Sequence, residues 1–193
     1  MYPSANGTRV AANTLCPPSE PSVASQAKGL GAVAVSAVMR DAGLTHKVFY
    51  KHFANKDELL VESLKEGFQE IIDILVRAAE QSPPGDAWKA IVNTYLRPEM
   101  CEYPEHGCPL ATLAPELARV DRRMKPKVVA ELVNYKGHMV PFMPGRRTMD
   151  KERAFFAIFS TMIGAIEIAR LLPDPAIREK VLGSARDFLL RSF

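Results

Sequence analysis

The sequence predicts an all-α protein, on three observations. From about residue 32 onward, apolar residues recur at spacings of three and four, the period of a helix with one buried face. No run of alternating apolar and polar residues is long enough to indicate a β-strand. Proline and glycine clusters, such as Ser-Pro-Pro-Gly at 82–85, separate the periodic segments. Together these observations indicate amphipathic helices packed around a common core.

The first 34 residues differ in composition from the rest of the 193-residue chain. They contain four prolines and only three charged side chains, and are otherwise mostly small or polar. Such a segment cannot sustain a long helix, so we expect residues 1–21 to form a flexible arm and 22–28 a short helix ended by Gly29. No basic start followed by an apolar stretch indicates a signal peptide. The lack of a signal-peptide pattern and the presence of only three cysteines together predict a cytoplasmic protein.

Residues 36–52 have the pattern of two short helices joined by a tight turn. Ser36 can cap a helix that ends at Ala42, and Gly43 can adopt the left-handed conformation that ends it. Thr45 can then cap a second helix over 46–52. A helix, a turn with glycine and a second helix form the helix-turn-helix arrangement found in many DNA-binding proteins.

The polar side chains of this segment suit a DNA surface. Between Arg40 and Lys56 there are four cations and one anion, a net charge of +3 that equals that of the whole chain. Residues at the start of the second helix can reach base edges while neighbouring Tyr and Lys reach phosphates. The alternative is a solvated helix whose lysines serve only solubility. The side chains predicted to face DNA are Thr45, His46, Lys47, Tyr50, Lys51, His52 and Lys56.

A long helix is predicted to follow directly. Asn55 and Glu58 have capping-box spacing, and apolar residues at spacings of three and four continue to Ala79 before the stop at 82–85. Asp86 can cap the next helix, and Pro109 is tolerated in the first turn of a later one. We predict further helices over 87–96, 108–119, 126–139, 150–172 and 175–193, with loops over 97–107 and 139–147.

Two runs of sequence resemble the signature of TetR-family transcriptional regulators: AGLTH at 42–46 and FYKHFANKDELL at 49–60. The resemblance implies an all-helical, homodimeric repressor that binds a DNA operator, does no catalysis and needs no cofactor. Carried over by position, Thr45, His46 and Lys47 would lie at base edges. Tyr50, His52 and Lys56 would contact phosphates. A third run, GCPLATLAPEL at 107–117, is similar to one in a subset of these regulators.

Two features depart from that family pattern. Lys47-Val48 replaces the small residues usual after Thr-His, so a long cation can change base preference. The stretch that corresponds to the family's first helix, 22–30, contains glycine and no aromatic residue. This leaves open an alternative function: a TetR-like ligand-binding dimer with impaired DNA binding. An enzyme using Cys108 is a third possibility, but no phosphate-binding loop, catalytic triad order or carboxylate pair supports it.

The domain organisation follows from these elements. We expect an arm over 1–21, a helix-turn-helix domain over 22–67, and a ligand-binding and dimerisation domain over 68–193. The segment 154–172 is long and apolar enough to suggest a membrane span, but Glu167, Arg170 and the charges at 150–153 argue against one. We instead expect the helices 150–172 and 175–193 to pair with those of a second subunit.

The sequence does not specify the class of the small-molecule effector. Large apolar or amphipathic side chains are candidates for its pocket, although each is more often plain core. Cys108 lies at a predicted helix start, where the dipole lowers a thiol pKa, so it is a candidate thiol sensor; the alternative is a packed, inert thiol. Cys101, His106 and Cys108 do not have a standard zinc spacing, so no metal site is predicted. The pocket candidates are Trp88, Tyr95, Met100, Met139, Phe142, Phe159 and Met162.

Overall fold

The computed structural model describes residues 55–103 and 107–193, and all regular structure in these residues is helical. The predicted all-α class is therefore confirmed, while the arm over 1–21 and the helices predicted over 22–28, 36–42 and 46–52 lie outside the described residues. The helices are α4 (Lys56–Glu80), α5 (Ala87–Tyr95), α6 (Glu99–Glu102), α7 (Leu110–Leu117), α8 (Lys125–Met139), the 3-10 turn η2 (Val140–Phe142), α9 (Thr148–Arg170) and α10 (Pro175–Ser192).

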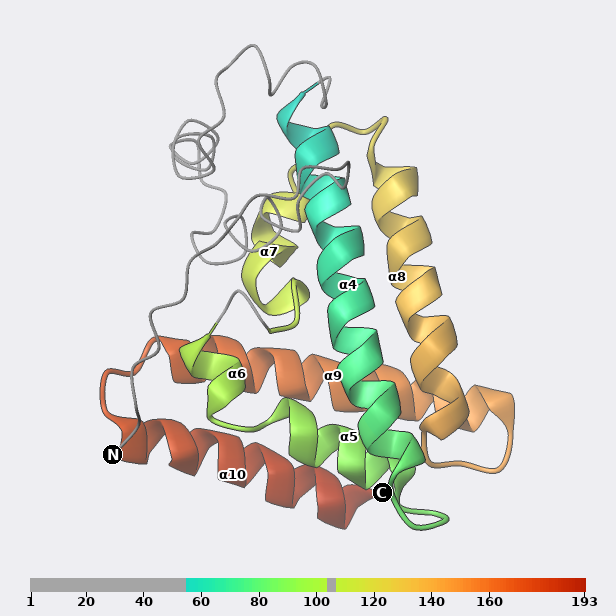
Figure 1. The fold of residues 1–193 in the computed structure, drawn as a ribbon, viewed down its shortest axis with the longest axis vertical. Helices are drawn as coiled ribbons and strands as arrows, with labels where there is room; N and C mark the ends of the chain where they lie inside the picture. The colour runs from blue at the N-terminus through green and yellow to red at the C-terminus, as the bar shows by residue number, and fades with distance from the viewer. Residues whose placement is uncertain (1–54, 104–106) are drawn as a thin grey trace, which may run out of the picture.

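Two pairs of helices set the shape of the described part (Figure 1). Helices α4 and α8 pack side by side and run along the long axis of the molecule. Helices α9 and α10 form an antiparallel pair that crosses beneath them. Helix α5 packs between the two pairs, with contacts to α4, α9 and α10, and α6 and α7 pack on α9.

The core lies where these two pairs meet. Helix α4 buries Leu64, Phe68, Ile71 and Leu75, each at most 1% exposed, at the predicted spacings of three and four. The Phe68 ring stacks on Tyr135 of α8, with centroids 4.5 Å apart and planes 9° apart. Burying these large side chains removes apolar surface from water and so stabilises the packing of α4 on α5 and α8.

The start and end of α4 agree with the sequence prediction. The Asn55 side chain accepts a hydrogen bond from the backbone N–H of Glu58, at 2.9 Å, and so caps the helix. The helix ends at Glu80, just before the predicted stop. Within that stop, Gly85 has φ of +90°, a conformation that side chains other than glycine rarely adopt.

Three local predictions need correction. Residues 97–107 were predicted as a loop, but 99–102 form α6, a single turn too short to show a hydrophobic period. Asp86 precedes α5 without a side-chain cap, because its carboxylate pairs with Lys89 at 2.7 Å. The helix predicted over 108–119 is shorter, running from Leu110 to Leu117. Helices α8, α9 and α10 lie within two residues of their predicted bounds.

No helix in the described ranges is long and apolar enough to cross a membrane. Helix α9 was the candidate, and its two interior charges have different surroundings. Glu167 is exposed, whereas Arg170 is partly buried and hydrogen-bonded to α6 and α7. Helix α9 therefore packs one apolar face on the core of the chain and leaves a second apolar face exposed.

Candidate functional site

Lys56, one of the predicted phosphate contacts, is the first residue of α4. It sits directly after the Asn55 cap, so the backbone at this position is fixed by a hydrogen-bonded helix turn. The other predicted DNA contacts, Thr45, His46, Lys47, Tyr50, Lys51 and His52, lie outside the described residues. Their placement stays a prediction from the sequence.

The first turn of α4 is tied to the connection between α7 and α8. The Asp57 carboxylate accepts a hydrogen bond from the backbone N–H of Asp121 at 2.7 Å, and Glu58 lies 3.8 Å from Lys127. Lys125 donates to the carbonyls of Leu117 and Ala118 at the end of α7, at 3.0 and 2.5 Å. The segment beside Lys56 is therefore held to the end of α7 and the start of α8.

Most of the predicted pocket residues are core. Six of the seven are buried, and Phe142 is partly exposed. The six buried residues are Trp88, Tyr95, Met100, Met139, Phe159 and Met162. Trp88 and Phe142 both line a surface hollow near η2, together with Lys151. Only Phe159 lines the apolar cavity described next.

An apolar cavity of about 260 Å³ lies between α7, α8 and α9. Phe155, Phe156 and Phe159 of α9 form one wall, and α8 forms the opposite one. The sequence did carry a signal for it, the three phenylalanines within 155–159, but size and apolarity alone do not separate a cavity wall from a filled core. The α7 and α8 residues that line it are Leu110, Val129, Leu132, Val133, Tyr135 and Lys136, and α9 adds Ser160 and Ile163.

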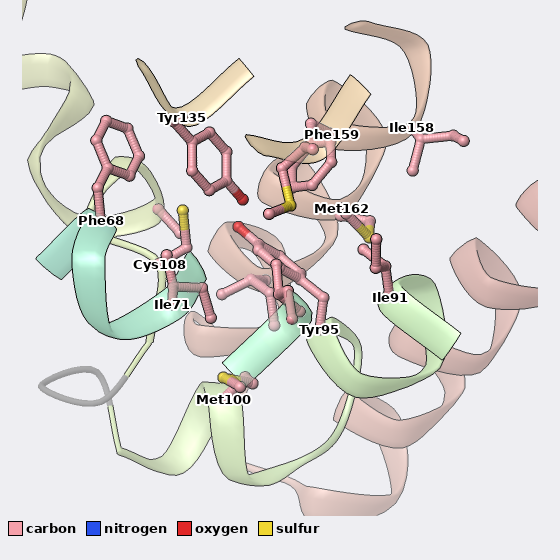
Figure 2. Close-up of a cluster of buried hydrophobic side chains, with 14 of the residues drawn as sticks. Phe68, Ile71, Ile91, Tyr95, Met100, Cys108, Tyr135, Ile158, Phe159 and Met162 are labelled. Carbon is pink, nitrogen blue, oxygen red and sulfur yellow. The ribbon is translucent and has the colours of Figure 1, made fainter. Parts of the chain in front are cut away.

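Tyr95, Tyr135 and Cys108 form a buried polar cluster beside this cavity. Figure 2 shows the two tyrosine hydroxyls pointing toward each other with the Cys108 thiol nearby. Both tyrosine rings contact Phe159 edge to face, with centroids 6.0 Å away for Tyr95 and 5.3 Å for Tyr135. Neither hydroxyl makes a full hydrogen bond, although each is fully enclosed; the thiol facing Tyr95 is only a weak partner.

The pKa predicted for Cys108 is wrong in direction. The N–H groups of Leu110 and Ala111 at the start of α7 do lower the pKa of this thiol. Burial raises it by more, because Cys108 is only 3% exposed and the thiolate would lose its hydration. The thiol pKa therefore lies above its ordinary value, which favours the packed-thiol alternative over a reactive sensor.

Arg170 joins three helices near this cluster. Its guanidinium donates from α9 to the carbonyl of Met100 on α6 at 2.9 Å, and to the carbonyl of Ala111 and the hydroxyl of Thr112 on α7, both at 2.8 Å. Burial lowers the pKa of Arg170, although arginine stays charged at any physiological pH. The sequence marked this residue only as an interruption in an apolar helix.

Helices α9 and α10 expose several large apolar side chains. Ile168 on α9 is 54% exposed, Leu171 directly after α9 is 81% exposed, and Ile177 and Phe188 on α10 are 47% and 61% exposed. Gly164 on α9 borders open space, with no atom within 4 Å of the position a Cβ would occupy. We call these residues the α9–α10 face. They combine large apolar side chains with a glycine at which another helix can approach closely.

Comparisons with known proteins agree with this architecture. Residues 25–62 match the family model described as bacterial regulatory proteins, tetR family. No curated protein matches the chain significantly.

Solved structures share its fold. A TetR-family transcriptional regulator from Streptomyces coelicolor is similar with a TM-score of 0.66 and 19% identity, covering 89% of this chain and 90% of that one. A TetR-family regulator from Agrobacterium tumefaciens has a TM-score of 0.66 and 16% identity, covering 88% and 92%. The reduced form of NemR from E. coli has a TM-score of 0.67 and 14% identity, covering 89% and 94%.

Proposed function

We propose that this chain, which carries a match to the tetR-family N-terminal domain over residues 25–62 and has the fold of TetR-family transcriptional regulators, is a ligand-responsive repressor. It binds a pseudo-palindromic DNA operator as a homodimer. The proposal rests mainly on where the family match lies in the chain. The family match covers the basic segment Arg40–Lys56, and its last residues form the first turns of α4, which continues into the core.

The proposed division of the chain places residues 22–67 in the DNA-binding domain and 68–193 in the ligand-binding and dimerisation domain. The boundary falls inside α4, which is a single continuous helix of 25 residues. A shared helix of this kind supports a regulator in which a change among the C-terminal helices alters the position of the DNA-binding domain.

The α9–α10 face supports the proposed homodimer. Two copies of this helix pair, related by a two-fold axis, would form a four-helix interface and cover Leu171, Ile177 and Phe188. Gly164 would let the two α9 helices approach closely. Two DNA-binding domains held in this way meet half-sites about one helical turn of DNA apart.

DNA binding is tested with the full chain and duplexes from the region upstream of its own coding sequence, by fluorescence anisotropy at several salt concentrations. We expect specific binding that weakens steeply with salt. Lys56→Ala lowers affinity for all sequences alike and reduces the salt slope by about one. Lys47→Ala changes sequence preference. Lys65→Ala is the matched control, because this exposed lysine lies on the same helix and pairs with Glu62.

Two outcomes would contradict the proposal. An absence of specific binding even at low salt favours the alternative of a ligand-binding dimer with impaired DNA binding. Equal effects of the Lys47 and Lys56 substitutions on sequence preference would show that the assigned roles, base contact and phosphate contact, are wrong.

A further inference from the structure

We propose that a second basic surface, at the connection between α7 and α8, contacts the DNA backbone beside the phosphate predicted for Lys56. This inference rests on the proposed function and adds to it a DNA-binding surface outside residues 22–67. The surface, which we call the α7–α8 patch, consists of Arg119, Arg122, Arg123, Lys125 and Lys127.

The positive charge of the chain is concentrated in two segments. Residues 119–127 hold five cations and one anion, and the segment Arg40–Lys56 holds four cations and one anion. The rest of the chain has 16 cations against 20 anions, so it is net negative although the whole chain is net positive. Duplex DNA has one negative charge about every 1.7 Å along its axis, so its field favours the two positive segments over the rest of the surface.

The α7–α8 patch lies at the same end of the molecule as Lys56. In Figure 1, the end of α7 and the start of α8 lie beside the start of α4. The hydrogen bond from the Asp121 N–H to the Asp57 carboxylate, 2.7 Å long, fixes this arrangement. Lys56 precedes Asp57 and Arg122 follows Asp121, so standard bond lengths place the Cα atoms of Lys56 and Arg122 at most about 15 Å apart. Because one DNA strand rises about 3.4 Å per nucleotide, this distance covers about four phosphates.

Three cations of the patch hold the connection in place. Arg123 pairs with Asp121 at 3.0 Å, and Lys127 lies 3.8 Å from Glu58 of α4. Lys125 donates to the last carbonyls of α7. The backbone that presents the patch is therefore fixed against both α7 and the first turn of α4.

The remaining two cations, Arg119 and Arg122, are available to a partner. Both are exposed, and neither side chain makes an ion pair or hydrogen bond with another residue in the part of the chain that the structure describes. An arginine without an internal partner loses no protein contact when it binds a phosphate. Its planar guanidinium also matches a phosphate in two parallel hydrogen bonds. We therefore assign the direct phosphate contacts to these two arginines.

The test titrates the full chain with the operator duplex, by fluorescence anisotropy at several salt concentrations. The variant combines Arg119→Gln with Arg122→Gln. We expect it to bind about tenfold more weakly at about 100 mM salt, with a salt slope reduced by about two, one for each arginine. Unrelated duplexes should lose affinity by the same factor, because phosphate contacts do not read sequence.

A charge-matched control combines Arg77→Gln with Arg146→Gln. Both arginines are exposed. Arg77 lies in the last turn of α4, and Arg146 follows a glycine that lines the surface hollow with Gly85, just beyond α4. This control removes the same charge at the opposite end of α4 from Lys56, so its affinity should stay within about twofold of the parent.

Asp121→Asn should act in the opposite direction. It removes the one anion of the segment and releases Arg123, while its amide oxygen can still accept from the Arg123 N–H. We expect it to bind the operator about two- to threefold more tightly, because the removed charge lies within about one Debye length of the phosphates. Unchanged or weaker binding would contradict a direct role of the patch.

Ethylation interference locates the contacts on DNA. Phosphates whose ethylation weakens binding of the parent but not of the Arg119 and Arg122 variant should lie within about four nucleotides of those identified in the same way with Lys56→Ala. If no such phosphates exist, or if they are scattered over the duplex, the patch makes no defined contact and the inference is wrong.

Two further results would overturn the inference. Equal losses in the patch variant and the charge-matched control would show that only net charge matters. A clear fall in Tm for the patch variant, which we expect to stay within about 2 °C of the parent, would assign the two arginines to the fold. A parent chain that binds no operator contradicts the proposed function itself. A parent that binds, while the patch variant keeps the full salt slope, contradicts this inference alone.

Discussion

At the scale of single residues, the core holds three weak acids that stay neutral at physiological pH. Burial raises the pKa of Cys108 and, more strongly, those of Tyr95 and Tyr135. In the unfolded chain the same groups ionise at their ordinary pKa values, about 8.5 for the thiol and about 10 for the phenols. Their contribution to stability is therefore complete below about pH 8.5 and is lost as the pH rises.

We expect Cys108→Ala to flatten the alkaline limb of the stability curve. Above about pH 9, the free energy of unfolding of the parent should fall as the pH rises. In the variant this fall should be less steep, by up to about 1.4 kcal/mol per pH unit. Urea titrations between pH 7 and 10 measure the slope separately from the lower overall stability of the variant. Cys101→Ala should flatten the curve less, because Arg170 and Arg178 partly offset the burial of that thiol. An unchanged slope in Cys108→Ala would mean that this thiol ionises in the folded protein.

At the scale of helices, the side chain of Arg170 holds the end of α9 to two neighbouring helices. Arg170 bridges α9 to α6 and α7 through three hydrogen bonds, two of them to backbone carbonyls. Helix α6 is a single turn and cannot be stable by itself, so its position depends on such tertiary contacts. Met100, a predicted pocket residue, lies in α6 and is buried there.

Arg170→Met should lower the free energy of unfolding by about 2–4 kcal/mol, because it leaves the carbonyls of Met100 and Ala111 without their donor. Arg153→Met is the matched control: it changes an exposed arginine of the same helix and should stay within about 0.5 kcal/mol of the parent. Urea unfolding measures both. Similar losses in the two variants would show that Arg170 acts only as a surface charge.

At the scale of the whole molecule, the apolar surface is distributed unevenly. The α9–α10 face exposes Ile168, Leu171, Ile177 and Phe188, so an isolated subunit leaves several large side chains in water on two adjacent helices. Burying them in an isologous contact is the simplest way for the chain to remove that surface from water.

Phe188→Asp should shift the proposed dimer to monomers at micromolar concentration, because the substitution would place two buried carboxylates near each other across its two-fold axis. Light scattering coupled to size exclusion measures the mass. Val129→Asp, which changes an exposed residue of α8 away from this face, should leave the dimer intact. If both variants keep the parent mass, the subunits associate through another surface.

The fold was largely predictable from local signals, whereas the site was not. Asn55, the apolar spacing of α4 and the prolines after its end are each local signals that act on the few residues around them, so the sequence alone locates this helix. Burial of Cys108 by several helices raises the pKa of its thiol and reverses the predicted direction of the shift, even though a hydrogen bond from Tyr95 lowers that pKa. Tyr135 and Phe155 were not predicted to line a cavity, because a gap between helices depends on how far apart they pack.

The unbroken length of α4 has a mechanical consequence. Its 25 residues span about 37 Å at 1.5 Å per residue. The Phe68–Tyr135 stack lies near its middle, at the wall of the cavity, and Lys56 lies at its far end. A tilt of about 5° at the C-terminal end would carry the Lys56 end sideways by about 3 Å, close to the 3.4 Å rise of one base pair. In the proposed regulator, the helix would act as a lever arm, on which a small displacement at a buried ring amounts to a shift of one base step on DNA.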